Sequence, residues 1–295
     1  MSACVRAWLL ACRPKTLFAS VAPVALGTAL AFSERAGHWG AALAALLGAL
    51  SIQIGTNLAN DYWDARKGAD TAERLGPLRV TSAGLLQPRT VFRGMVAVFA
   101  VACAAGLYLV SRAGWPVVAI GSVSIACGIL YTAGPFPLAY VGLGDVFTFV
   151  FFGLVATAGT YFVQALAITP AALMLGCVPG FYSVVLIALN NLRDRDTDVL
   201  ANKRTSAVRF GSGFARAEIV CCLLAPAAVP LWMAMEGLSH WVPAGAAAAV
   251  CLLVGWPVAS AVLRITDMRR INGLFPLTAA ASLVMAGVIS LLLFI

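Results

Sequence analysis

Long runs of apolar residues alternate with short polar segments along the whole chain. A transmembrane helix needs about 17–25 predominantly apolar residues to cross the hydrocarbon core of a bilayer. Most of the apolar runs reach that length, so the pattern predicts an all-α, multi-pass membrane protein. We expect nine membrane-spanning helices, with approximate bounds 16–33, 39–59, 94–111, 116–132, 145–166, 170–190, 217–235, 241–262 and 274–295.

The composition agrees with this pattern. The 295 residues are 61% hydrophobic and only 11% charged, whereas soluble domains carry about 25% charged residues. No linker rich in Ser, Gly or Pro divides the sequence, so we expect a single domain over residues 1–295. The eight cysteines show no CxxC spacing and lie mostly within apolar runs, which predicts a packing role for them.

Basic residues sort to one side of the nine expected spans. If the N-terminus is cytoplasmic, every one of the 20 Lys and Arg except Arg35 and Arg112 falls on the cytoplasmic side, as the positive-inside rule requires. The C-terminus is then outside, and His38 and His240, each followed by Trp, lie at the outer interface. Anionic lipid headgroups account for the net charge of +8. We see no RNA-binding signature or long basic tail and expect no nucleic-acid partner.

Two clusters of acids and carboxamides interrupt the apolar pattern, at the ends of the second and sixth expected spans. Side chains three and four positions apart share a helix face, so the members of each cluster should point together. Acids are costly at membrane depth, and oxygen ligands of this kind suit Mg²⁺, which bridges carboxylates to substrate phosphates. The first cluster contains Asn57, Asn60, Asp61 and Asp64, and the second contains Asn190, Asp194 and Asp198.

Basic residues follow each cluster and can bind phosphate oxygens. Together with the acids they predict a diphosphate site at the membrane surface, with a lipid tail among the helices. Metal ions and basic side chains would stabilise the departing diphosphate, and an apolar cavity would keep water away from the allylic cation. The candidate diphosphate-binding residues are Arg66, Lys67, Arg79, Lys203 and Arg204.

These motifs resemble those of the UbiA superfamily of intramembrane prenyltransferases, which carry an NDxxD-type motif after the second helix and a DxxxD motif after the sixth. Here the two motifs stand as Asn60-Asp61-Tyr62-Trp63-Asp64 and Asp194-Arg195-Asp196-Thr197-Asp198. The ordered resemblance covers most of the chain. It also includes Arg13-Pro14-Lys15-Thr16, Lys67-Gly68-x-Asp70, Gly76-Pro77-Leu78-Arg79, the stretch from Tyr131 to Tyr140, Gly142-Leu143-Gly144-Asp145 and Lys203-Arg204-Thr205.

The resemblance implies nine helices around a central, laterally open cavity, in a bacterial cytoplasmic membrane. Within the superfamily, the details most resemble the branch that prenylates 1,4-dihydroxy-2-naphthoate in menaquinone synthesis. That implies a polyprenyl diphosphate substrate, loss of the naphthoate carboxylate and release of diphosphate. The resemblance assigns the Mg²⁺–diphosphate to Asn60, Asp64, Asn190, Asp194 and Asp198, with Asp61 and Asn57 in support. The acids expected to be catalytic are Asp61, Asp64, Asp194 and Asp198.

The remaining substrate-binding residues are less well defined by the motifs. Many relatives place a further Asp four residues after the first motif, where this chain has Gly68; Asp70 is a candidate substitute from the loop. Inside-flanking charges and interfacial tyrosines also serve as topology signals and anchors. Arg13 and Lys15 are candidates for orienting the diphosphate or the acceptor's carboxylate. Tyr131, Tyr140 and Asp145 are candidates for binding the acceptor, the last because the sequence offers it no evident partner.

Three other functions remain open at this point. A related prenyltransferase could use another acceptor, such as 4-hydroxybenzoate or homogentisate. A cation-coupled transporter would also use intramembrane acids, although transporters bind their substrates near the bilayer midplane. A CDP-alcohol phosphotransferase usually carries a DGxxAR pattern, which is absent from this sequence.

Overall fold

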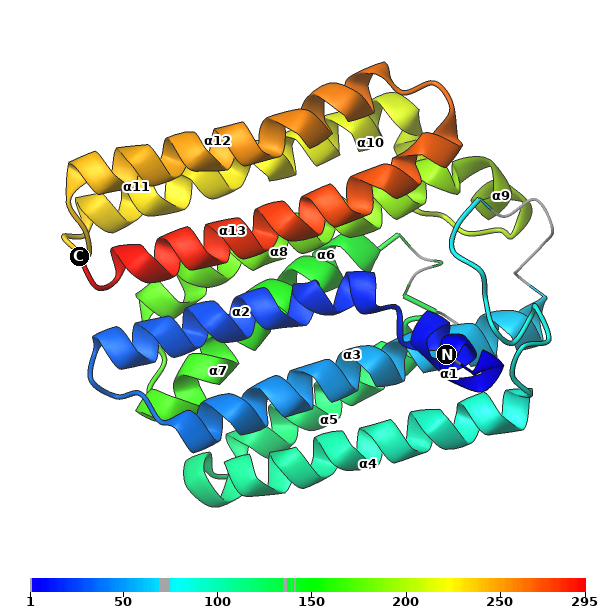
Figure 1. Cartoon of the computed structure of the whole chain (residues 1–295), viewed down its shortest axis with the longest axis horizontal. Helices are drawn as coiled ribbons and strands as arrows, with labels where there is room; N and C mark the ends of the chain where they lie inside the picture. Colours follow the sequence, from blue (N-terminus) through cyan, green and yellow to red (C-terminus); the bar gives the residue numbers. More distant parts are fainter. Residues whose placement is uncertain (1, 69–74, 135–136, 139, 141) are drawn as a thin grey trace.

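The computed structural model of the chain describes residues 2–68, 75–134, 137–138, 140 and 142–295. Within these residues the regular structure is entirely helical, with no strand. The long helices lie side by side and share one general direction, so that the loops gather at the two ends of the bundle (Figure 1). The prediction of an all-α fold is confirmed.

The described residues form thirteen α-helices with three short helical segments of other types between them. The first half of the chain contains α1 (Ala3–Cys12), α2 (Pro14–Ser33), α3 (Trp39–Lys67), α4 (Pro88–Ala113), α5 (Pro116–Leu130), α6 (Gly144–Phe149), the π-helix η1 (Val150–Val155) and α7 (Ala156–Ala165). The second half contains α8 (Pro170–Arg193), α9 (Arg195–Leu200), α10 (Ser206–Leu224), η2 (Ala225–Ala227), α11 (Ala228–Met235), α12 (Trp241–Arg264), η3 (Met268–Gly273) and α13 (Leu274–Leu292).

Seven of these helical segments are long and apolar enough to cross a membrane: Trp39–Lys67, Pro88–Ala113, Gly144–Ala165, Pro170–Arg193, Ser206–Met235, Trp241–Arg264 and Met268–Leu292. The pair Ala3–Thr16 and Phe18–Ser33 passes the same test only as a unit that bends by 50°. Helix α5 is apolar but has only 15 residues. All nine predicted apolar runs are therefore helical, and seven have the length and hydropathy of a span.

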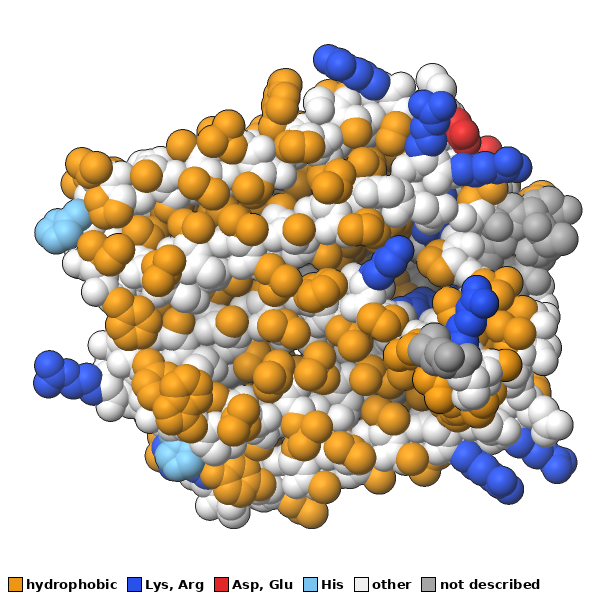
Figure 2. Space-filling model, in the orientation of Figure 1, with side chains coloured by type: hydrophobic (Ala, Val, Ile, Leu, Met, Phe, Trp, Pro, Cys, Tyr) orange, Lys and Arg blue, Asp and Glu red, His pale blue; other side chains and the backbone are white. Residues whose placement is uncertain are grey.

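The surface has the polarity of a multi-pass membrane protein. Apolar side chains cover the middle of the visible face, while Lys and Arg side chains gather mainly at the end that carries α1 and α9 (Figure 2). The His side chains lie toward the opposite end, where the C-terminus also lies. The predicted sorting of charge along the sequence thus corresponds to two distinct ends of the bundle.

Glycines let the broken helix α6–η1–α7 pack directly against α8. A Cβ atom added to Gly153 of η1 would lie 2.6 Å from backbone atoms of both Gly176 and Gly180. Such close backbone approach is typical of helix interfaces in membranes, where van der Waals packing replaces the hydrophobic effect. This contact fixes one wall of the central cavity.

Two clusters of buried apolar side chains flank that cavity. The larger cluster joins α2, α7 and α8 to α10, α12 and α13. The smaller one joins α1, α3 and α4, and it includes Val80 and Leu86 from the loop between α3 and α4. The cavity between them is thus held by packing on both sides.

Candidate active site

A cavity of about 430 Å³ runs between the helices. Its walls come from α2, α3, α4, α5, the α6–η1–α7 helix, α8 and α9. Its polar end lies beside the two acidic motifs, and its other end is lined mainly by apolar residues and glycines. Among the residues at the polar end are Arg13, Asn57, Asn60, Asp64, Arg79, Tyr131, Asn190, Asp194, Asp198 and Lys203.

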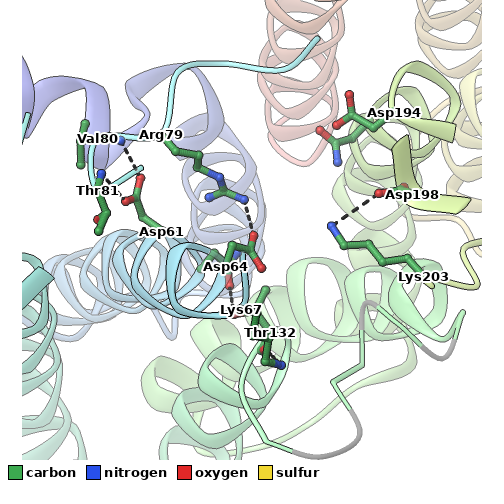
Figure 3. A network of polar contacts seen from close by, with 12 residues as sticks. Asp61, Asp64, Lys67, Arg79, Val80, Thr81, Thr132, Asp194, Asp198 and Lys203 are labelled. Carbon is green, nitrogen blue, oxygen red and sulfur yellow. Dashed lines mark hydrogen bonds and ion pairs between the residues drawn. The ribbon is translucent and has the colours of Figure 1, made fainter. Parts of the chain in front are cut away.

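The last turns of α3 carry the first motif, and of its two acids Asp64 is the one that lines the cavity. Asp64 is 2% exposed and accepts a hydrogen bond of 2.7 Å from Nη2 of Arg79, which is itself 8% exposed. Arg79 comes from the loop between α3 and α4 and reaches over the end of α3 toward Asp64 (Figure 3). The structure therefore brings a candidate metal ligand and a candidate diphosphate-binding residue together.

Two carboxamides on the same face of α3 also line the cavity. Oδ1 of Asn60 accepts a hydrogen bond of 3.0 Å from the Thr132 hydroxyl. One turn deeper, Nδ2 of Asn57 donates to the carbonyl oxygen of Cys12 at 3.0 Å and to the Thr16 hydroxyl at 3.2 Å. Asn57 thereby ties α3 to the junction of α1 and α2, beside Arg13.

Asp61 has a different environment from its neighbours in the motif. Its carboxylate accepts hydrogen bonds from the backbone N–H groups of Val80, at 3.1 Å, and Thr81, at 2.9 Å. Asp61 is 2% exposed and does not line the cavity. It holds the loop that delivers Arg79, so the predicted shared face applies to Asn57, Asn60 and Asp64 only.

The second motif begins at the end of α8, where Asp194 caps the helix and the short α9 follows. Arg193 holds Asp194 in a two-pronged ion pair, with Nε donating to Oδ1 at 2.8 Å and Nη2 donating to Oδ2 at 2.6 Å. Nη2 of Arg193 also donates to Oδ1 of Asn190. The expected face of Asn190, Asp194 and Asp198 does line the cavity, although the helix is interrupted at Asp194.

Asp198 lies across the cavity mouth from Asp64, on the side of α9 (Figure 3). Nζ of Lys203 lies 3.4 Å from Oδ1 of Asp198 and 5.3 Å from the ring centre of Tyr140. Nζ of Lys67 lies 5.2 Å from the same ring and donates to the carbonyl oxygen of Thr132 at 2.6 Å. Tyr140 thus stands between the two lysines that follow the two motifs.

The acids form two separate half-sites in the part of the chain that the structure describes. No three His, Cys, Asp or Glu side chains there approach closely enough to enclose a metal ion by themselves. Mg²⁺ is commonly held by one or two carboxylates together with substrate phosphates. The donor set fits that arrangement, with one carboxylate and one carboxamide on the α3 side of the mouth and two carboxylates and one carboxamide on the α8–α9 side.

Several candidates lie outside the cavity or outside the described residues, among them Arg66, Lys15, Arg204 and Asp70. Arg66 is exposed and donates to the Tyr62 hydroxyl at 2.9 Å, and Lys15 and Arg204 are also exposed; none of the three lines the cavity. Asp70 falls outside the described residues. Of the five predicted diphosphate-binding residues, only Arg79 and Lys203 line the cavity, while Lys67 lies at its edge against Tyr140.

The acceptor candidates differ in whether they line the cavity. Tyr131 lines the cavity, and removal from water raises its pKa above the usual tyrosine range, with the charges of Asp145, Asp198 and Asp64 acting in the same direction. Its hydroxyl therefore stays protonated at neutral pH. Asp145 does not line this cavity but accepts a hydrogen bond of 3.4 Å from Nδ2 of Asn191, so it has the partner that the sequence did not reveal.

Several residues to which the sequence motifs assigned no role contribute to the site. Thr132 binds Asn60, and Asn191 binds Asp145. Arg193 binds Asp194 and Asn190, although the sequence indicated no role for it beyond its place in the second motif stretch and among the inside-flanking charges. Position next to an acidic motif is the one signal that the sequence offers for Arg193, and it applies equally to Arg195, which contacts Asp196 and the carbonyl oxygen of Ala207 and none of the proposed metal ligands.

Comparison with known proteins places the chain in a family. The sequence model of the UbiA prenyltransferase family matches residues 20–278. The 1,4-dihydroxy-2-naphthoate octaprenyltransferase of Mycobacterium tuberculosis is 38% identical over 253 residues, which cover 86% of each chain. The Escherichia coli K12 protein of the same name is 37% identical, over 74% of this chain and 73% of that protein.

Solved structures share the fold. A UbiA homolog from Archaeoglobus fulgidus bound to DMAPP and Mg²⁺ superimposes with a TM-score of 0.64 at 15% identity, covering 94% of this chain and 99% of that one. The same homolog bound to GPP and Mg²⁺ gives a TM-score of 0.65 at 14% identity. On the strength of the family match and the similar relatives, this chain belongs to the UbiA prenyltransferase family, as its two acidic motifs predicted.

Proposed function

We propose that this enzyme transfers a polyprenyl chain from polyprenyl diphosphate to 1,4-dihydroxy-2-naphthoate, with loss of the carboxylate and release of diphosphate, giving demethylmenaquinol. The observation that carries the proposal is one continuous cavity with acids and cations at its mouth and an apolar interior. Such a cavity suits a substrate with a charged head and a hydrocarbon tail. The names of the similar proteins from M. tuberculosis and E. coli supply the acceptor.

Two half-sites would hold Mg²⁺ together with the diphosphate. Asn60 and Asp64 contribute oxygens from α3, and Asn190, Asp194 and Asp198 contribute them from α8 and α9. Bound Mg²⁺ would neutralise the charge that develops on the leaving diphosphate. The A. fulgidus homolog with DMAPP and Mg²⁺ supports this choice of metal.

Arg79 and Lys203 are the cations best placed for the diphosphate. Both line the cavity, and each already pairs with a motif acid, Arg79 with Asp64 and Lys203 with Asp198. With Mg²⁺ held by the motif acids, Arg79 and Lys203 would be available to donate hydrogen bonds to phosphate oxygens at the same end of the cavity. Charge-assisted hydrogen bonds of this kind are about twice as strong as neutral ones.

The chemistry then needs only binding, orientation and exclusion of water. The bond between the allylic carbon and the diphosphate oxygen breaks, and the ring carbon that bears the carboxylate forms a new bond to the allylic carbon. Loss of carbon dioxide returns the electron pair of its bond to the ring and restores aromaticity. Arg13 and the protonated Tyr131 line the same polar end and are the candidates for orienting the acceptor.

We further infer that all nine apolar runs cross the bacterial cytoplasmic membrane and that the chain is one domain. The bent α1–α2 unit and the short α5 would supply the two crossings beyond the seven long segments. An odd number of crossings agrees with termini at opposite ends of the bundle (Figure 1). Reporter fusions test this topology: a C-terminal alkaline phosphatase fusion should be active and a C-terminal green fluorescent protein fusion should be dark.

Diphosphate release by the purified full-length protein in detergent tests the proposed activity. Parallel reactions contain farnesyl diphosphate and Mg²⁺ with 1,4-dihydroxy-2-naphthoate, with 4-hydroxybenzoate or with no acceptor. EDTA and the Asp64→Asn variant serve as controls. We expect metal-dependent release and a prenylated, decarboxylated product only with the naphthoate.

Each other result has a distinct meaning. Turnover with 4-hydroxybenzoate alone would support prenyl transfer from the diphosphate but contradict 1,4-dihydroxy-2-naphthoate as the acceptor. No release in any reaction, from protein that remains folded and monodisperse, would contradict the proposed function and favour transport. Full activity of Asp64→Asn would remove the metal half-site on α3 from the mechanism.

A further inference from the structure

The cations that pair with the motif acids occupy two different kinds of position. Arg79 and Lys203 line the cavity, where a substrate can reach them. Arg193 does not line the cavity, and its side chain is only 1% exposed. Its partners Asp194 and Asn190 do line the cavity, so Arg193 contacts them from behind the wall.

The guanidinium of Arg193 is held on every side. Its nitrogens donate to both carboxylate oxygens of Asp194 and to Oδ1 of Asn190. Nη1 donates to Oδ1 of Asn272 at 2.9 Å, and the guanidinium lies 5.4 Å from the ring centre of Phe275. To reach a substrate, Arg193 would have to leave all of these partners and its buried position.

Asn272 links this arrangement to the other half of the site. It belongs to η3, just before α13, and its Nδ2 donates to the carbonyl oxygen of Leu75 at 2.9 Å. Leu75 precedes Arg79 in the segment that follows the first motif. One carboxamide therefore connects the second motif, through Arg193, with the segment that carries Arg79.

We propose that Arg193 is a positioning residue for the metal site: from behind the cavity wall it orients the ligand oxygens of Asp194 and Asn190, and Asn272 fixes it in place. This inference rests on the proposed function, because it assumes that those oxygens face a metal ion. Residues that orient metal ligands from the second sphere commonly change metal affinity by 10–100-fold when they are replaced. The last two helical segments, η3 and α13, thus take part in building the site.

Direct measurement of metal binding tests the role without relying on turnover. Mn²⁺ replaces Mg²⁺, and electron paramagnetic resonance reports free Mn²⁺ during titration of the full-length protein in detergent with inorganic diphosphate present. Arg193→Lys is the informative variant, because lysine keeps the charge and loses the planar fork that holds two carboxylate oxygens. We expect its Kd for Mn²⁺ to rise about tenfold or more.

Arg195→Lys is the matched control. Arg195 lies two residues away; it pairs with Asp196 at 3.5 Å and donates to the carbonyl oxygen of Ala207 at 3.2 Å, and neither partner is a proposed metal ligand. The same exchange there should leave Mn²⁺ binding unchanged. Asn272→Ala should weaken Mn²⁺ binding in the same direction as Arg193→Lys, and the double variant should be no worse than the stronger single one, because the residues act as a unit.

Steady-state kinetics separate positioning from substrate contact. At saturating Mg²⁺, Arg193→Lys should have a KM for polyprenyl diphosphate close to that of the wild type. Unchanged Mn²⁺ affinity in both Arg193→Lys and Asn272→Ala would overturn the proposal, as would a raised KM at saturating Mg²⁺. If Arg193→Lys does not fold, Asn272→Ala alone decides the outcome. Wild-type protein that binds no Mn²⁺ and releases no diphosphate would instead contradict the proposed function.

Discussion

Asp64 and Arg79 form a buried ion pair at the cavity mouth, with Nη2 of Arg79 2.7 Å from Oδ2 of Asp64. The two side chains are 2% and 8% exposed. The pair joins the last turns of α3 to the loop before α4, across 15 residues of sequence. Removal of one partner from a buried pair typically costs about 3–5 kcal/mol, because the remaining charge loses its compensation. The first motif and its cation therefore form one structural unit.

Replacing Arg79 should weaken binding of the diphosphate. We expect Arg79→Gln to raise the KM for polyprenyl diphosphate about tenfold or more, because hydrogen bonds to charged groups contribute about 1.5–3 kcal/mol each. Arg66→Gln should change this KM little, because Arg66 is exposed and binds the Tyr62 hydroxyl outside the cavity. Initial rates at saturating Mg²⁺ and acceptor measure both. If both substitutions raised the KM for polyprenyl diphosphate equally, the larger set of diphosphate-binding cations predicted from the sequence would be correct.

Asp61 and Asp64 should respond differently to the same substitution. Asp64→Asn removes a charge from the cavity wall and should lower kcat at least 100-fold, since second-sphere changes alone reach 10–100-fold in metal sites. Asp61→Asn weakens the charge-assisted bonds to the N–H groups of Val80 and Thr81 and should act on the loop. We expect a lower melting temperature and a raised KM, with kcat reduced much less than in Asp64→Asn.

Thermal unfolding and full kinetics of both variants, prepared in the same detergent, check this pair. A loss of kcat in Asp61→Asn as large as in Asp64→Asn would place Asp61 in the chemistry after all. Its structural position argues otherwise, because its carboxylate faces the loop and not the cavity.

Helical periodicity explains how much of the site could be predicted from the sequence. Apolar runs locate the helices, and spacing of three and four residues correctly groups Asn57, Asn60 and Asp64 on the cavity side of α3. The same rule misplaced Asp61, because adjacent residues lie about 100° apart around a helix and a loop 19 residues away supplies its partners.

Tertiary contacts decide the roles of the basic residues, and no local pattern reveals them. Arg66 and Arg193 both lie in the last turn of a helix next to an acidic motif. Arg66 is exposed, whereas Arg193 is buried against Asn272, which is 79 residues away in the sequence. The local sequence does not distinguish the two arginines; the packing of η3 and α13 against α8 does.

The aromatic ring of Tyr140, and not its hydroxyl, should affect the binding of polyprenyl diphosphate. The ammonium groups of Lys67 and Lys203 lie 5.2 Å and 5.3 Å from the ring centre, so the ring's negative face favours holding two like charges near the cavity mouth. Tyr140→Phe keeps this ring and should leave the KM for polyprenyl diphosphate nearly unchanged. Tyr140→Leu should raise it about twofold to fivefold, as expected for a cation–π contact of about 0.5–1 kcal/mol at an exposed site. Equal behaviour of the two variants in initial-rate assays would exclude the ring as the cause.

The apolar end of the cavity should set the length of prenyl chain that the enzyme accepts. Gly106, Gly121 and Gly159 line the cavity from α4, α5 and α7, and a Cβ added at any of them would meet no atom within 4 Å. Glycine inside a helix costs about 1 kcal/mol relative to alanine. At these three positions no neighbouring helix packs so closely that only glycine fits. The absence of a side chain instead leaves the cavity open there.

Distance along α3 predicts which substrates a bulky residue would exclude. Gly48 also lines this end, and 16 residues separate it from Asp64, which corresponds to about 24 Å at 1.5 Å per residue. A geranyl chain held by its diphosphate at Asp64 stops well short of that end, whereas an octaprenyl chain passes it. We therefore expect Gly121→Leu to lower kcat/KM for octaprenyl diphosphate about tenfold or more and to leave kcat/KM for geranyl diphosphate nearly unchanged.

Gly287→Leu is the matched control, because Gly287 is an exposed glycine of α13 where an added Cβ would also meet no atom within 4 Å, and it does not line the cavity. Equal losses with both substrates in Gly121→Leu would show that the long chain takes another route between the helices.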